Sequence, residues 1–138
     1  MLAIYPPTRQ AITDQVVVWS FRPSATVESY VRTAGLSERG EFLLYASRTQ
    51  VDQRTAFNEH CSGLVEQTVV LGCYADQRSY IYDVTDARLS GIKEVTAAHE
   101  MLHAAYERLD SAQRETVNRL LGDQFSKITD QHFLDTVA

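Results

Sequence analysis

The sequence lacks any concentration of positive charge. It has 13 Lys and Arg residues against 18 Asp and Glu residues, a formal net charge of -5, and no basic stripe. Proteins that bind nucleic acid neutralise backbone phosphates with clustered Lys and Arg side chains. We therefore expect no nucleic-acid partner for this chain.

Long hydrophobic runs are also missing. A transmembrane helix needs about 20 consecutive apolar residues, and no segment approaches that length. The first ten residues, MLAIYPPTRQ, have neither the basic start nor the apolar centre of a secretory signal. We expect no membrane span in this chain, and leave open a signal or an anchor in a longer native protein.

Cysteine is scarce, because Cys61 and Cys73 are the two in the chain and no C-x2-C pair occurs. Zinc sites built from thiolates use such short paired spacings, so we expect none. Both cysteines adjoin segments that should be ordered and pack together, AFNEHC and VVLGCY, so we predict a Cys61–Cys73 disulfide. That pairing implies an extracytoplasmic or cell-surface protein, and two buried free thiols in a cytoplasmic protein are the alternative.

Periodicity and turn residues predict both strands and helices. After an extended lead-in at 1–15, we expect strands at 16–21, 42–47, 68–74 and 79–84, the last two forming an antiparallel hairpin. We expect helices at 24–34, 53–61 and 93–109. A last helix should begin at Asp110 or Ser111 and bury Val117, Leu120, Leu121, Phe125 and Ile128. The fold class is therefore α+β, with a small antiparallel or mixed sheet packed on helices.

Nothing in the sequence divides this fold into parts. We find no internal repeat, low-complexity stretch or linker, and 138 residues is close to the commonest domain size. We predict one domain over residues 1–138, with truncation at both ends relative to the native protein left open.

The helix predicted at 93–109 is strongly amphipathic. Its apolar residues recur at helical spacing and are expected to face the core. They are Val95, Ala98, Leu102, Ala105, Tyr106 and Leu109.

The same helix contains an HExxH pentad, from His99 to His103. Side chains four residues apart project from one side of a helix, so both imidazoles can reach one metal ion. We predict that His99 and His103 bind Zn2+, and that Glu100 is the general base that takes a proton from the attacking water. The alternative is that these are ordinary helix residues, because motif matches include false positives.

The segment VTAAHEMLHAAY, residues 95–106, resembles the zincin metallopeptidases. With LGCY, YIYDVTD and residues 57–61, it is similar to an uncharacterised bacterial gluzincin-like group. The resemblance implies zinc-dependent hydrolysis of a peptide or protein substrate by a zincin-like fold with a central HExxH helix. It also implies an edge strand, here Ser79 to Val84, that pairs with the substrate backbone.

The third zinc ligand is not assigned by the resemblance. Metzincin-like sites continue HExxHxxGxxH, but Tyr106 and Leu109 stand at the Gly and third His positions, and no NExxSD-like glutamate motif follows. The candidates are Glu107, Asp110, His132 or a residue beyond Ala138. We therefore expect this chain to hold zinc incompletely and to show little peptidase activity.

Two further interpretations stay open. Tyr80, Tyr82 or Tyr106 could offer a hydroxyl to a reacting oxyanion, although tyrosines at strand and helix spacing are more often core or rim residues. His60 is expected to be a surface or capping residue. The alternative to an enzyme is a catalytically silent zincin-like module that serves binding or structure in a larger envelope protein.

Overall fold

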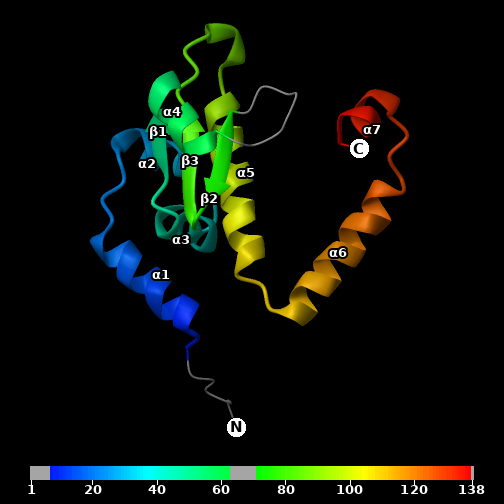
Figure 1. The fold of residues 1–138 in the computed structure, drawn as a ribbon, viewed down its shortest axis with the longest axis horizontal. Coiled ribbons are helices and arrows are strands. Elements are labelled where there is room, and N and C mark those ends of the chain that lie inside the picture. The colour runs from blue at the N-terminus through cyan, green and yellow to red at the C-terminus, as the bar shows by residue number, and fades with distance from the viewer. Residues whose placement is uncertain (1–6, 63–70, 138) are drawn as a thin grey trace. The chain divides into compact units, whose positions relative to one another are not determined.

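The computed structural model describes residues 7–62 and 71–137 of the chain. They fall into two compact units, residues 1–107 and 108–138. The predicted α+β class is confirmed, because the described residues form seven α helices and a three-stranded mixed sheet (Figure 1). The expectation of one domain over the whole chain stays a prediction.

The first unit carries the sheet. In chain order it contains α1 (Arg9–Ser20), α2 (Ala25–Thr33), α3 (Glu38–Ala46), β1 (Gln50–Asp52), α4 (Arg54–Cys61), β2 (Gly72–Ala75), β3 (Arg78–Tyr82), the 3-10 helix η1 (Ala87–Leu89) and α5 (Ile92–Glu107). The second unit contains α6 (Ser111–Phe125) and α7 (Gln131–Val137). No helix in the described ranges is long and apolar enough to cross a bilayer.

The sheet has the strand order β1-β3-β2. Strand β1 runs parallel to β3, and β2 runs antiparallel to it with Gly72 opposite Ile81. The predicted hairpin is therefore confirmed, and its turn residues Asp76 and Gln77 have the positive φ angles that two-residue hairpin loops favour. Residues 68–70 of the first predicted strand lie outside the described residues.

Two predicted strands are wrong, and so is the extended lead-in over its residues 9–15, which are helical. Residues 16–21 belong largely to α1, which begins after Thr8, whose side chain accepts a hydrogen bond from the Ala11 amide. Residues 42–47 belong largely to α3, capped in the same way by Ser37. The polar segment before residues 42–47 is thus the start of a helix. In both apolar runs, the packing of α1 against α3 overrides the strand propensity of the residues.

The other short elements agree with the sequence. Helix α2 begins after its Ser24 cap and is followed by Gly35 at a φ of 66°. Helix α4 matches the predicted short helix. Helix α6 begins after Asp110, which forms a capping box with Gln113.

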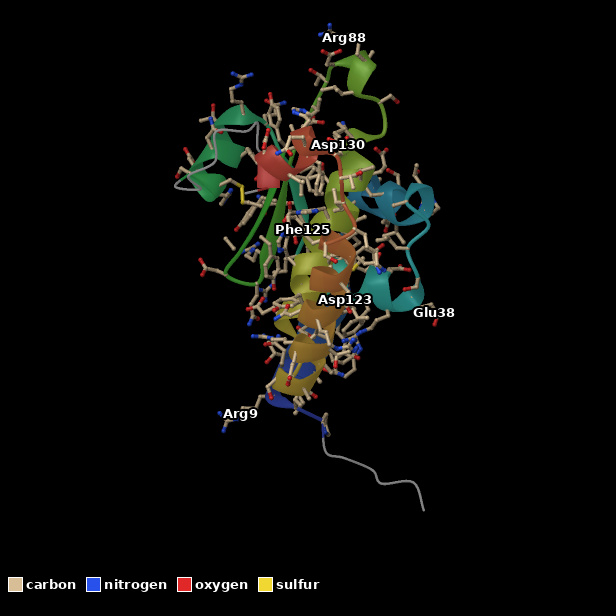
Figure 2. All side chains as sticks on the ribbon, turned by 90° about the vertical axis from the view of Figure 1, so that its right-hand side faces the viewer. Arg9, Glu38, Arg88, Asp123, Phe125 and Asp130 are labelled. Carbon is tan, nitrogen blue, oxygen red and sulfur yellow. A yellow bond between two sulfur atoms is a disulfide. The ribbon has the colours of Figure 1, made fainter. Side chains whose placement is uncertain are left out.

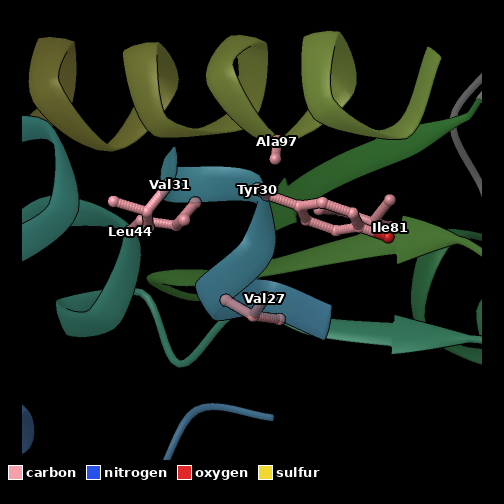
Figure 3. Close-up of a cluster of buried hydrophobic side chains, with 6 residues drawn as sticks. All are labelled: Val27, Tyr30, Val31, Leu44, Ile81 and Ala97. Atoms are coloured by element: carbon pink, nitrogen blue, oxygen red, sulfur yellow. The ribbon is translucent and has the colours of Figure 1, made fainter. Parts of the chain in front are cut away.

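The main core lies between the sheet and the helices α2, α3 and α5 (Figure 3). Its buried residues are Val27, Tyr30, Val31, Leu44, Ile81 and Ala97. A smaller cluster of Phe57, Cys73 and Tyr80 packs between the sheet and α4. The sheet is therefore covered by helices on both faces, and α5 runs beside β2 and β3.

The Cys61–Cys73 disulfide is confirmed. It joins the last residue of α4 to β2, with the two Cα atoms 5.9 Å apart, and Figure 2 shows the bond in yellow. No free cysteine is found among the described residues.

The predicted buried face of α5 is wrong. On this helix Val95 is 65% exposed and Leu102 is 60% exposed. The buried residues of this helix are instead Thr96, Ala97, Glu100 and Ala104. Small side chains let the sheet approach closely on that side, which a count of apolar residues does not reveal. Within the second unit no residue of α6 is buried, and its predicted core face stays a prediction.

Candidate metal centre

The two histidines of the pentad converge on the exposed side of α5. The Nε2 atoms of His99 and His103 lie 3.1 Å apart, and their rings meet edge to face with centroids 4.8 Å apart. Two imidazole nitrogens bound to one tetrahedral zinc ion at about 2.0 to 2.1 Å would lie about 3.3 to 3.4 Å apart. The pair thus fits a shared zinc ion with a small adjustment of either side chain.

The electrostatics of the pair also suit a metal ion. Partial burial, followed by the neighbouring charge of His99, lowers the pKa of His103 from its usual value. A lower pKa favours the neutral imidazole, which is the form that binds a metal ion. The burial of His103 therefore favours the form of this side chain that binds zinc.

Glu100 follows His99 in the chain, and its side chain is buried against β2. Its side chain is 4% exposed, and burial raises the pKa of its carboxyl group from 4.5 to about 7. Desolvation disfavours the charged carboxylate, so the group takes up a proton more readily than an exposed glutamate does. A carboxyl group with a pKa near 7 is suited to act as a general base at neutral pH.

Strand β2 is the wall that buries Glu100. A Cβ atom added at Gly72 would lie 2.7 Å from Glu100 Oε1 and 2.5 Å from Thr96 Cγ2. Only glycine lets the backbone of β2 come this close to α5. The approach of β2 therefore places a strand directly against the carboxyl group of the pentad.

Tyr74, two residues along β2, lies beside His103. Its ring is nearly parallel to the imidazole, at an interplanar angle of 9° with centroids 6.5 Å apart. Its hydroxyl donates a hydrogen bond to the carboxylate of Glu107. The sequence analysis missed Tyr74, although its separation of two from Gly72 places both residues on one face of a strand.

The prediction that residues 79–84 form an edge strand for the substrate is wrong. Strand β3, which contains most of the predicted Ser79–Val84 segment, is the central strand and pairs with β1 on one side and β2 on the other. Its backbone is therefore used within the sheet. In the described part of the first unit, the edge strand beside α5 is β2.

The tyrosines named from the sequence lie away from the pentad or are solvent-exposed. Tyr80 and Tyr82 pack with Phe57 on the face of the sheet that α4 covers. Tyr106 is 37% exposed on α5. His60, expected at the surface, stacks on Tyr80 with centroids 4.1 Å apart and lies 3.3 Å from a carboxylate oxygen of Asp52.

A third ligand is not brought to the two histidines. Over residues 7–62 and 71–137, no group of three His, Cys, Asp or Glu side chains is placed to hold one metal ion. Of the predicted candidates, Glu107 accepts the hydrogen bond from Tyr74, and Asp110 caps α6. His132 lies in α7 of the second unit.

Comparison with known proteins adds no relative, because no family model, curated protein or solved structure matches the chain.

Proposed function

We propose that this protein is a zinc-dependent metallopeptidase. The observation that carries the proposal is the pair of imidazole nitrogens 3.1 Å apart on α5, where the residue that follows His99 is a buried glutamate whose pKa is raised to about 7. Two convergent imidazoles and a glutamate base are part of what a hydrolytic zinc site requires.

Each of these residues has a distinct role in the proposal. His99 and His103 would hold the zinc ion, which when bound lowers the pKa of water and polarises a carbonyl group. Glu100 accepts a proton from the attacking water as the new C–O bond forms. The same carboxylic acid then donates that proton to the leaving amine as the C–N bond breaks, which returns Glu100 to its starting state.

The substrate proposed is an extended peptide or protein segment on β2. The backbone of this strand lies against the Glu100 side chain at Gly72. An edge strand offers free amide and carbonyl groups that a peptide can pair with. This alignment replaces the one on β3 that the sequence implied.

The disulfide supports a location outside the cytoplasm. Disulfides persist in oxidising compartments and are rare in cytosolic proteins, and the one described here joins α4 to β2. We propose an extracytoplasmic or cell-surface location, with a cytoplasmic protein as the alternative.

A second candidate is a zincin-like module without catalysis, which binds a partner or supports a larger envelope protein. The absence of a three-ligand group among the described residues favours it, because catalytic zinc sites ordinarily have three protein ligands. For the metallopeptidase, the third ligand stays a prediction.

The test compares Glu100→Gln with the wild type, each loaded with zinc, on a mixed library of quenched fluorescent peptides. We expect slow cleavage by the wild type, because its third zinc ligand is not assigned, and cleavage at the background rate in the variant, with zinc content unchanged. Glu94→Gln in the first turn of α5 is the matched control and should remain active. Full activity of Glu100→Gln would refute its role as the base. Zinc binding without cleavage by the wild type would favour the silent module.

A further inference from the structure

Strand β2 presents its side chains alternately to two different partners. Gly72 lies against Glu100 and Thr96 of α5, and Tyr74 lies against α5 one pleat further on. Cys73 between them points to the other face, where its disulfide joins α4. The strand that borders the candidate metal centre is therefore fixed from both sides.

Tyr74 contacts two residues of α5 that share one side of the helix. His103 and Glu107 are four residues apart, so their side chains are neighbours along the helix. The ring of Tyr74 lies parallel to the imidazole of His103, within the range of offset aromatic pairs. Its hydroxyl donates a hydrogen bond to the Glu107 side chain.

We propose that Glu107 and Tyr74 form a positioning pair that sets the orientation of the His103 imidazole for metal binding. The inference rests on the proposed zinc site. Metal affinity depends on the groups that orient the ligating histidines, and substitution of such groups typically costs 10- to 100-fold. In this assignment Glu107 acts through Tyr74, whose hydroxyl it anchors, and not as the third ligand.

The first experiment measures the zinc dissociation constant by competition with a chromophoric chelator at neutral pH. Tyr74→Phe keeps the ring but loses the hydroxyl, and Glu107→Ala removes the acceptor. We expect each to weaken zinc binding about 10-fold. The double variant should be no weaker than either single one, because both break one interaction.

Glu107→Gln is the conservative variant that separates the alternatives. Its amide oxygen still accepts from Tyr74, so near wild-type affinity is expected. If Glu107 were a ligand, Glu107→Gln would lose zinc as Glu107→Ala does, while Tyr74→Phe would not. Tyr82→Phe on the opposite face of the sheet is the matched control and should change nothing.

The second experiment does not depend on zinc. In the metal-free protein, the imidazole proton signals of His103 should shift in Glu107→Ala and in Tyr74→Phe, and stay in place in Glu107→Gln and Tyr82→Phe. Unchanged His103 signals in Glu107→Ala would overturn the positioning pair. So would variants that only lower the melting temperature and leave zinc affinity intact. A protein that binds no zinc but shows these shifts would refute the proposed function and support the pair.

Discussion

Helix α5 exposes its larger apolar side chains and buries polar ones, the reverse of what hydrophobicity predicts. The exposed face carries Val95 and Leu102 together with both histidines, whereas the buried face carries Thr96 and the carboxyl group of Glu100. Burying a carboxyl group is costly, and its raised pKa is one expression of that cost. A helix that buries its glutamate and exposes its valine breaks the apolar pattern of its own sequence, and such local conflicts are expected at functional or strained positions.

The largest expected effect on stability comes from the loss of the disulfide, which joins β2 to α4. The Cys61→Ala/Cys73→Ala double variant should lower the free energy of unfolding by about 3 kcal/mol, because the disulfide closes a loop in the unfolded chain. Urea denaturation checks this. The wild type in reductant should fall to the same stability, and a loss below about 1 kcal/mol would show that β2 is held without the disulfide.

The close approach of β2 to the buried face can be tested at Gly72. Gly72→Ala should lower stability by about 1 to 3 kcal/mol, because its Cβ would lie 2.5 Å from the methyl group of Thr96. That methyl is held in place by the bond from Thr96 Oγ1 to the Ile92 carbonyl. Adding Thr96→Ser removes the methyl and should restore part of the loss. Gly122→Ala on α6, where a Cβ meets no atom within 4 Å, should cost nothing. Equal stability of Gly72→Ala and wild type would contradict the packing.

Because Val95 is exposed and Val27 is buried, replacing each valine by threonine should change stability by different amounts. Val27→Thr places a hydroxyl in the fully buried core and should cost about 1 to 3 kcal/mol. Val95→Thr on the exposed face of α5 should stay within about 0.5 kcal/mol. Both are measured by thermal or urea unfolding. A cost above about 1 kcal/mol at Val95 would favour the buried face that the apolar pattern predicts.

The smallest effect at neutral pH is expected at Tyr30. Its hydroxyl is buried with no hydrogen-bond partner among the described residues, so Tyr30→Phe should be neutral or slightly stabilising. Burial, and then the charges of Glu94 and Asp83, raise its pKa from 10.0 to about 12. The unfolded chain therefore ionises first, and this residue lowers stability only as the pH rises above 10. Unfolding curves should show that the stability of the variant relative to the wild type increases from pH 9 to pH 11. A stability difference that stays the same at both pH values would contradict the raised pKa of Tyr30.

Local signals in the sequence predicted part of this fold well. Ser24 and Gly35 mark the ends of α2, and the Asp76–Gln77 turn separates two strands that pair as predicted. The spacing of His99 and His103 is also a local property of a helix, so their convergence follows once α5 forms. These elements depend on neighbours in the chain.

Features that depend on distant packing were not predicted. Helices α1 and α3 contain apolar runs typical of strands, yet they pack on each other as helices. The buried face of α5 is set by the approach of β2, and the position of β3 in the centre of the sheet is set by β1. Tyr74 meets Glu107 across 33 residues of chain. Each depends on contacts that no window of sequence contains.

A zinc ion held between two imidazoles on the exposed face of α5 is the feature on which the proposed function depends. Calorimetric titration of zinc into metal-free protein without a histidine tag tests for this ion, with each of the four histidines replaced by alanine in turn. We expect close to one zinc per chain at saturation, a large loss of affinity in His99→Ala and His103→Ala, and no change in His60→Ala. The His132→Ala variant reports whether the second unit supplies a ligand. Zinc binding to His103→Ala as tight as to the wild type would show that the two imidazoles do not form the site.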